Sequence, residues 1–325
     1  MQKKKLNPKA LSRLGQTGTI FGIGAMQTQE VTSQNLFIVS ADYAKPAGMS
    51  RFINSYPNNF INVGIAEQNL IGISAGISNE GYRVVASAQS CFLSMRCFEQ
   101  VRQFCGYMKY PLILVGVSSG FALTFFGNTH YSLEDLAILR NVKGLNIFTP
   151  SDAVSALSIF EYASNLDEPS YIRCTGGVNT PIIYNETFDA SKGFSSLITG
   201  DDILIISSGN ITINALRAAE KLNDNKISTE FIDLHSLWPI SPGIFNNFSK
   251  YKLVVTIEEH FNQGGLGSIV KEAMQDSGFK NKLLNINVGD KYVVPGDYEY
   301  LINESGLSDD GIYHKVFETF KKIKL

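Results

Sequence analysis

Short apolar runs rich in β-branched residues recur along the chain, with helical patterns between them. In the first half these runs are NLFIVSA, YRVVASA, PLILVGVS, LNIFTP and SYIRC, and in the second half they are DDILIISSG, STEFIDL, KLVVTIEE and LLNINV. Continuous apolar runs, as opposed to alternating ones, are typical of parallel strands that helices cover on both faces. The pattern therefore predicts an α/β fold with two doubly wound, mainly parallel-sheet domains.

A connector separates the two halves of the chain. The chain has 325 residues, which is more than one hydrophobic core usually supports. Between residues 174 and 196 the sequence CTGGVNTPIIYNETFDASKGFSS carries glycines and turn residues but little periodicity. We therefore predict one domain over residues 8–190 and a second over residues 191–325.

Composition excludes several classes of function. Apolar residues make up 44% of the chain, and the net charge of -2 gives no footprint for nucleic acid or for an anionic membrane. The basic start, MQKKKLNPK, is not followed by the apolar core of a signal peptide. Four cysteines stand in apolar runs without a CxxC pair, which predicts free buried thiols in a reducing, cytoplasmic compartment and no zinc site. These are Cys91, Cys97, Cys105 and Cys174.

One uncharged stretch has the length of a membrane span. From Tyr110 to Leu133 the chain contains no Asp, Glu, Lys or Arg. Two polar groups of residues interrupt it, SSG at 118–120 and NTH at 128–130, and lipid would not satisfy them. We predict a buried strand, LILVGV, followed by an uncharged loop. Open α/β sheets bind their ligands at such carboxyl ends of strands.

Two glycine-rich segments are weak candidates for anion sites. FGIGAMQ (21–27) lacks the third glycine of a dinucleotide fingerprint and no strand precedes it, so we interpret it as an ordinary helix start. GGLGS (264–268) follows a predicted strand and opens a predicted helix. Its backbone N–H groups could bind an anion, and close backbone packing explains the glycines equally well.

Glu67 is the hardest residue to explain by packing. It stands in INVGIAEQN, directly before the small-residue run LIGISAGIS, and no Lys or Arg occurs within a dozen residues on either side. An ionised carboxylate out of water is costly unless it is paired. Glu67 either interacts with the positive end of the following helix or is a buried acid that exchanges a proton with a group from outside the chain.

His130 and Arg173 each allow two interpretations. His130 precedes a predicted helix, for which Asn128, Thr129 or Ser132 could supply the cap. It is either a locally bonded helix-start residue or a residue at the mouth of a site. Arg173 ends the predicted strand SYIR, where it either bonds neighbouring loops or binds an anion.

Two long stretches resemble one enzyme family. FINVGIAEQNLIGISAGISNEGYRVVASAQSCFLSMRCFEQVR and FGNTHYSLEDLAILRNVKGLNIFTPSDA closely resemble the pyrimidine-binding domain of transketolases. VVTIEEHFNQGGLGSIVKEA is similar to the C-terminal domain of the same family. The family binds the diphosphate of thiamine diphosphate and its divalent metal through an N-terminal domain with a GDG motif, and no GDG occurs here. The chain thus resembles the C-terminal subunit of a split transketolase.

The resemblance implies a cofactor and a partner. The cofactor is thiamine diphosphate, with Mg²⁺ or another divalent cation held by a partner subunit that carries the GDG-type domain. Family members assemble as dimers of the full-length unit, so an α2β2 heterotetramer is expected. The reaction implied is the transfer of a two-carbon ketol unit from a ketose, phosphorylated or not, to an aldose or other aldehyde.

The resemblance also assigns the cofactor-binding residues. In the family the glutamate at the position of Glu67 hydrogen-bonds the N1′ atom of the aminopyrimidine, which promotes the imino tautomer that deprotonates C2 of the thiazolium. Phe92 matches the aromatic residue that stacks on the pyrimidine. Arg96 and Gln100 follow in the same segment near the site, and Asp42 occupies the place of the aspartate in the SAD motif.

On the substrate side the resemblance is less complete. His130 matches a histidine or glutamine beside the reacting sugar hydroxyls, and Arg173 matches the arginine that grips a substrate phosphate. Many family members have a histidine at the position of Ser118 and an aspartate at that of Phe126, and a serine that often helps to bind phosphate is Pro46 here. Loss of a charge that recognises a hydroxyl should redirect specificity.

Two other functions are compatible with this layout. A related thiamine-dependent carboligase or the β subunit of a 2-oxoacid dehydrogenase shares the two domains, although VGIAEQN and NTHYSLEDLAILR favour transketolase. A catalytically silent regulatory subunit would also retain the fold. Retention of Glu67, Phe92 and His130 argues against silence, whereas Ser118 and Phe126 are compatible with it.

Overall fold

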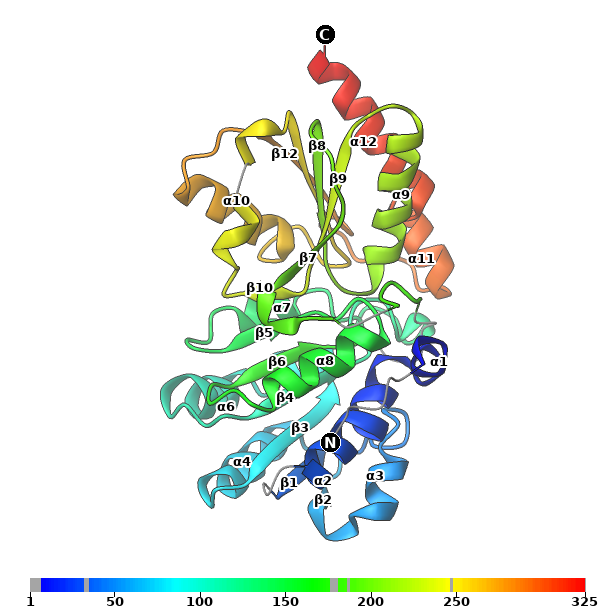
Figure 1. Cartoon of the computed structure of the whole chain (residues 1–325). Helices are drawn as coiled ribbons and strands as arrows, with labels where there is room; N and C mark the ends of the chain where they lie inside the picture. Colours follow the sequence, from blue (N-terminus) through cyan, green and yellow to red (C-terminus); the bar gives the residue numbers. More distant parts are fainter. Residues whose placement is uncertain (1–6, 32–34, 176–180, 186–187, 246–247, 325) are drawn as a thin grey trace.

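Two α/β domains make up the chain. The computed structural model describes residues 7–31, 35–175, 181–185, 188–245 and 248–324. A seven-stranded sheet forms the lower domain in Figure 1 and a five-stranded sheet forms the upper one. This confirms the predicted fold class. No helix in the described part of the chain is long and apolar enough to cross a bilayer.

The lower sheet is parallel except at one edge. Its strand order is β10-β5-β6-β4-β3-β1-β2, and only β10 runs antiparallel to its neighbour. The strands are β1 (Leu36–Ser40), β2 (Phe60–Asn62), β3 (Arg83–Gln89), β4 (Ile113–Val117), β5 (Asn146–Phe148), β6 (Ser170–Arg173) and β10 (Ser236–Trp238).

Helices cover both faces of this sheet. Val84 and Ala86 of β3 pack into one core, and Val85 between them packs into another, which is why the run is continuously apolar. The α-helices of this domain are α1 (Pro8–Thr19), α2 (Ala25–Val31), α3 (Ser50–Ser55), α4 (Glu67–Asn79), α5 (Ser90–Met95), α6 (Phe98–Val101), α7 (Asp135–Leu139) and α8 (Ala153–Ala163). The π-helices are η1 (Ile20–Gly24) and η3 (Arg102–Tyr107).

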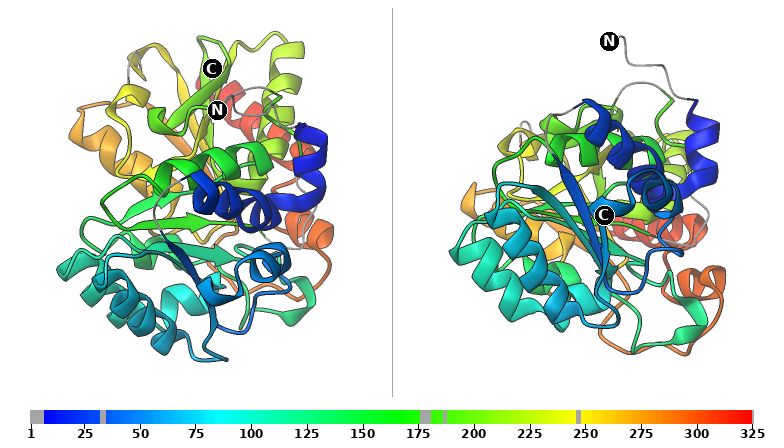
Figure 2. Two further views of the ribbon diagram at one scale, coloured as in Figure 1. Left: turned by 60° about the horizontal axis from the view of Figure 1, so that its bottom comes forward. Right: turned by 90° about the horizontal axis from the view of Figure 1, so that it is seen from below.

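The upper sheet has the order β12-β11-β8-β9-β7, with only β7 antiparallel. Helices α9 and α12 lie side by side on one face of it, and α10 lies on the other (Figures 1 and 2). Its strands are β7 (Phe194–Ile198), β8 (Ile203–Ser207), β9 (Thr229–Leu234), β11 (Leu253–Ile257) and β12 (Lys282–Ile286). Its helices are α9 (Thr212–Asp224), α10 (Leu266–Asp276), α11 (Tyr298–Glu304) and α12 (Asp309–Lys324).

All nine strands expected from the apolar runs are present, whereas β2, β7 and β10 were not predicted. β2 and β10 have three residues each, and β7 is only partly buried, so none gives a long apolar signal. The interpretation of FGIGAMQ as a helix start was wrong, because it lies in η1 and α2, which continue α1. The prediction of free buried cysteines is confirmed for all four.

The two halves are not cleanly separated. The upper sheet begins with β7 at Phe194, close to the boundary predicted at residue 190, but β10 leaves the second half and pairs with β5 of the lower sheet. Ser151 Oγ also donates a hydrogen bond of 2.6 Å to the buried carboxylate of Asp233, which lies in β9. The connection between the domains is therefore made by backbone pairing as well as by side chains.

The GGLGS segment binds a side-chain carboxylate of the same chain. The backbone N–H groups of Leu266 and Gly267, at the start of α10, donate to the carboxylate of Glu258 at 2.6 and 2.9 Å. Glu258 ends the run that forms β11, and burial raises its pKa to about 7. The positive end of α10 is thus occupied by a buried side chain.

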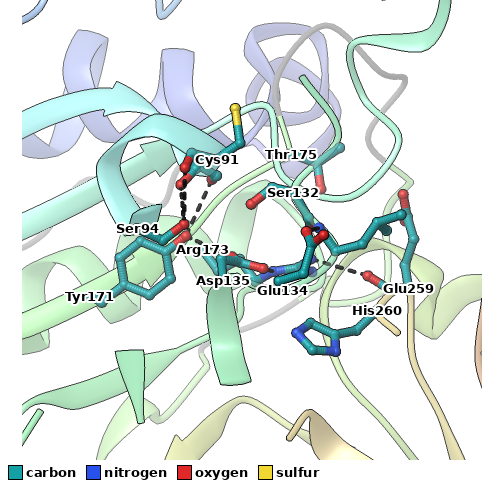
Figure 3. Close-up of polar contacts among 12 residues, drawn as sticks. Cys91, Ser94, Ser132, Glu134, Asp135, Tyr171, Arg173, Thr175, Glu259 and His260 are labelled. Atoms are coloured by element: carbon teal, nitrogen blue, oxygen red, sulfur yellow. Dashed lines mark hydrogen bonds and ion pairs between the residues drawn. The ribbon is translucent and has the colours of Figure 1, made fainter. Parts of the chain in front are cut away.

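Arg173 connects the domains at the carboxyl end of β6, and Figure 3 shows its surroundings. Its Nε donates to both carboxylate oxygens of Asp135 at 3.1 and 2.8 Å, and its Nη2 donates to the carbonyl oxygens of Ser132 and Glu259. Both members of the ion pair are buried. Tyr171 also donates to Asp135, at 2.7 Å.

This geometry departs from the role of phosphate ligand expected for Arg173. A phosphate ligand must present its guanidinium to an open site, whereas Arg173 is buried and its Nε and Nη2 are already bonded within the chain. The alternative interpretation, a strand-end charge bonded to neighbouring loops, fits the structure. We therefore assign Arg173 to the junction between the domains.

Removal of the Arg173 charge tests this assignment. Arg173→Gln should lower the free energy of unfolding by about 3–5 kcal/mol, because it leaves the buried Asp135 without its cation. Urea denaturation at neutral pH measures this value. The double variant Arg173→Gln/Asp135→Asn should recover part of the loss. A single variant of normal stability with a raised KM for phosphorylated substrates would contradict the structural role.

Candidate functional site

A cavity of about 370 Å³ lies at the carboxyl ends of the parallel strands of the lower sheet. Residues that follow β1 and β2, the end of β3, helix α5 and the loop before α7 all contribute to it. This is the edge at which open parallel sheets place their ligands. The lining residues are Ala41, Asp42, Tyr43, Ile65, Glu67, Gln89, Phe92, Arg96, Thr129 and His130.

Five of the residues predicted from the sequence therefore meet in one place. They are Asp42, Glu67, Phe92, Arg96 and His130. They come from four separate segments of the chain. Their sequence spacing does not bring them together, whereas the parallel sheet does, because its strands end at one edge. A second, more open depression of about 630 Å³ shares Ile65, Glu67 and Arg96 with this cavity and is also lined by Ala66, Gln68 and Asn69.

Glu67 is the first residue of α4, and its side chain is 7% exposed. The positive end of the helix favours a carboxylate there, without a side-chain capping bond, which is compatible with the first of the two interpretations of Glu67. The structure adds a partner that the local sequence does not reveal. Arg96 Nη1 donates to Glu67 Oε1 at 2.9 Å, across 29 positions of sequence. Glu67 Oε1 is thus paired by a side chain of the chain itself.

Phe92 lies between Arg96 and His130. The Cζ atom of Arg96 is 3.6 Å from the centroid of the Phe92 ring, and the His130 ring meets Phe92 edge to face at 5.3 Å. His130 Nδ1 is 2.9 Å from the hydroxyl of Thr129. His130 is therefore bonded locally and also lines the cavity, so both interpretations made for it are compatible with the structure.

Asp42 is held in an unusual backbone conformation beside the cavity. Its φ of 53° is in the left-handed region. Asn62, at the end of β2, accepts a hydrogen bond from its backbone N–H at 3.1 Å and donates one to its carboxylate at 3.2 Å. These bonds fix the turn after β1 and place Asp42 at the edge of the site.

The four other predicted site residues do not line the cavity. Arg173 lies in the buried junction between the domains. Gln100 lies in α6, and its amide oxygen is buried without a hydrogen-bond partner in the described part of the chain. Ser118 lies behind the lining residue Tyr43, with the two hydroxyl oxygens 3.2 Å apart. Phe126 is 66% exposed, and its ring is 5.2 Å from that of His130, at the mouth of the cavity.

Sequence reasoning did not assign three of the polar lining residues to the site, Tyr43, Gln89 and Thr129. Tyr43 directly follows Asp42, so its position was available from the motif. Gln89 ends β3, and its amide oxygen is buried without a hydrogen-bond partner in the described residues. A polar residue at the carboxyl end of a predicted parallel strand was the signal that could have identified it.

The predicted caps of α7 were also wrong. Glu134 precedes this helix as its N-cap, without a capping side-chain bond. Asn128 instead donates to the carbonyl oxygen of Val293 at 2.8 Å and accepts from its N–H at 3.2 Å. The loop that carries His130 is therefore attached to the upper domain.

Cysteine chemistry does not fit this site. Cys91 and Cys97 flank the segment of Phe92 and Arg96, but both are buried. Burial raises the pKa of each thiol to about 12, and for Cys97 the charge of Glu67 adds to this effect. Neither side chain is a nucleophile at neutral pH.

The lining residues fit the aminopyrimidine half of thiamine diphosphate. Glu67 supplies a buried carboxylate, Phe92 supplies a ring face, and Gln89 supplies a buried amide oxygen that has no hydrogen-bond partner in the described residues. Within the described ranges, no group of three or more His, Cys, Asp or Glu side chains could hold a metal.

Comparison with known families agrees with the geometry. Residues 24–177 match the family described as transketolase, pyrimidine binding domain. Residues 196–312 match the transketolase C-terminal domain. The first match contains the whole cavity, and the second covers the upper domain apart from most of α12.

Individual proteins are similar over most of their length. A putative transketolase C-terminal section from Methanocaldococcus jannaschii is 33% identical, over 89% of this chain and 92% of its own length. One of the subunits of an apulose-4-phosphate transketolase from Phocaeicola vulgatus is 31% identical, over 89% and 93%. A solved structure described as a split gene transketolase, inactive beta4 tetramer, is 29% identical with a TM-score of 0.82 and covers 94% of this chain and 98% of its own.

The fold, the lining of the cavity and these similarities lead to one conclusion. The chain belongs to the transketolase family of thiamine-diphosphate-dependent transferases, and it comprises the pyrimidine-binding and C-terminal domains of that family.

Proposed function

We propose that this chain forms one half of a divided transketolase active site, completed by a partner subunit with a GDG-type domain. That partner holds the diphosphate and its divalent cation. The observation that carries the proposal is the cavity of Glu67 and Phe92, which suits a pyrimidine, in a chain whose described residues offer no metal-binding cluster. The pair transfers a two-carbon ketol unit from a ketose to an aldehyde, and two such pairs form a heterotetramer.

The relatives support the need for a partner. Similarity extends over most of the length of a separate transketolase subunit and of a C-terminal section. The similar solved structure is described as a split gene transketolase, inactive beta4 tetramer. The open depression beside Glu67, with Ile65 78% exposed at its edge, gives a second subunit a place to complete the site.

The residues of this chain have separate roles in the proposed reaction. Thiamine diphosphate, when bound, supplies the nucleophilic carbon and stabilises the two-carbon unit. Glu67 holds a proton at N1′ of the pyrimidine, and its apolar surroundings strengthen that hydrogen bond. Phe92 orients the ring by stacking. His130, at the mouth beside Phe126, exchanges protons with the substrate hydroxyls.

Glu67→Gln in the reconstituted pair tests the role of the acid. Turnover should fall by about 10²–10⁴-fold, because glutamine cannot hold the proton at N1′. Folding should be unaffected, as measured by thermal denaturation. The matched control is Glu99→Gln, because Glu99 is also bonded to an arginine but on the surface. A Glu67→Gln pair that retains normal turnover would remove Glu67 from the mechanism and favour a regulatory subunit.

Substitution of Phe126 tests which substrates the reconstituted pair accepts. Because an exposed aromatic ring stands beside His130, the natural pair should turn over xylulose and ribose phosphates slowly. Phe126→Asp should raise kcat/KM for that substrate pair by about tenfold, since it restores a group that can bind a hydroxyl. Phe125→Asp is the control, because Phe125 is similarly exposed, whereas the ring that packs against His130 at the mouth is that of Phe126. Rapid turnover of these phosphates by the natural pair would contradict this specificity.

A further inference from the structure

The side chain of Arg96 contacts both groups to which a pyrimidine would bind, the ring of Phe92 and the carboxylate of Glu67. The guanidinium of Arg96 lies over the ring of Phe92, with Cζ 3.6 Å from the centroid, and its Nη1 donates to Glu67 Oε1 at 2.9 Å. Arg96 is the C-cap residue that follows α5, four positions after Phe92, so the two side chains lie on the same side of the helix. The ion pair and the stacking contact are made by the same planar group.

A guanidinium and an aminopyrimidine share the chemistry of these contacts. Each is a flat array of nitrogen atoms around carbon, each stacks on an aromatic face, and each donates N–H to a carboxylate when protonated. Arg96 therefore satisfies the buried carboxylate of Glu67, which would otherwise have lost its contact with water without compensation.

The two groups cannot use the same ring face together. A guanidinium carbon 3.6 Å from the centroid is in van der Waals contact with the Phe92 ring. A pyrimidine that stacks on this face and bonds to Glu67 Oε1 must first displace Arg96. The side chain is free to leave, because it is 48% exposed and also lines the open depression beside Glu67. Its backbone stays fixed, since Gln68 Nε2 donates to the Arg96 carbonyl at 3.1 Å.

We propose that Arg96 is an internal placeholder for the aminopyrimidine. In the empty subunit the guanidinium of Arg96 contacts Phe92 and Glu67, and it swings outward when the cofactor enters. This inference rests on the proposed function of the cavity. The exchange keeps Glu67 paired in both states, and it weakens the binding of pyrimidines to the chain by competition. The ligand class that the site selects is a planar, protonatable nitrogen heterocycle.

The test uses the full chain and a small probe, 4-amino-5-hydroxymethyl-2-methylpyrimidine, titrated by ligand-observed NMR. Arg96→Ala should bind the probe about tenfold more tightly than the natural chain, because the competing group is gone. Arg96→Gln serves as a second variant, and thermal denaturation verifies that both fold. The matched control is Arg102→Ala, since Arg102 is an exposed arginine paired with Glu99 on the next turn. It should leave the affinity unchanged.

Added guanidinium ion sharpens the test. At millimolar concentration it should weaken binding of the probe to Arg96→Ala toward the natural value, and it should have a smaller effect on the natural chain, in which the guanidinium of Arg96 already occupies these contacts. Affinity that Arg96→Ala leaves unchanged or lowers would overturn the placeholder while leaving the cavity a pyrimidine site. Absence of saturation in every variant would overturn the pyrimidine site itself, and with it the proposed function.

Discussion

A carboxylate that folding removes from water needs a partner, and this constraint organises the carboxyl edges of both sheets. Asp135 is paired with Arg173, and Glu258 accepts from the start of α10. Glu259 accepts from the Phe121 N–H at 2.6 Å and from Tyr298 at 2.7 Å. Most of these bonds join segments far apart in the chain, so they fix the domain junction and the loop that carries His130. The Glu67–Arg96 pair is different because one partner is half exposed and can leave.

This difference separates structural from functional charges. The Arg173–Asp135 pair lies between the domains, and removing either partner would leave a charge with no access to water. Arg96 faces two depressions, so Glu67 can exchange it for another donor at little cost. A buried acid with a replaceable partner is suited to binding a ligand that brings its own proton, and an aminopyrimidine is such a ligand.

Sequence patterns predicted the features that depend on residues close together in the chain. Continuous apolar runs gave the parallel strands, and the absence of nearby cations singled out Glu67. They did not predict β10, because pairing with β5 is a long-range choice made by only three residues. They also could not show that Arg96 reaches Glu67, or that Arg173 turns inward to Asp135, since both contacts depend on how separate loops pack. The resemblance to transketolases assigned Arg173 to phosphate for the same reason: a motif match identifies the residue but does not show which groups surround it in the fold.

The divided site is the central claim, because it explains why a cavity suited to a pyrimidine occurs in a chain that matches the pyrimidine-binding and C-terminal domains of the family. Calorimetric titration of thiamine diphosphate with Mg²⁺ tests it most directly, first into this chain alone and then into the chain mixed with a partner that carries a GDG motif. The account predicts tight binding only when the partner is present, and weak binding through the pyrimidine alone to the isolated chain. Equally tight binding to the isolated chain would contradict it.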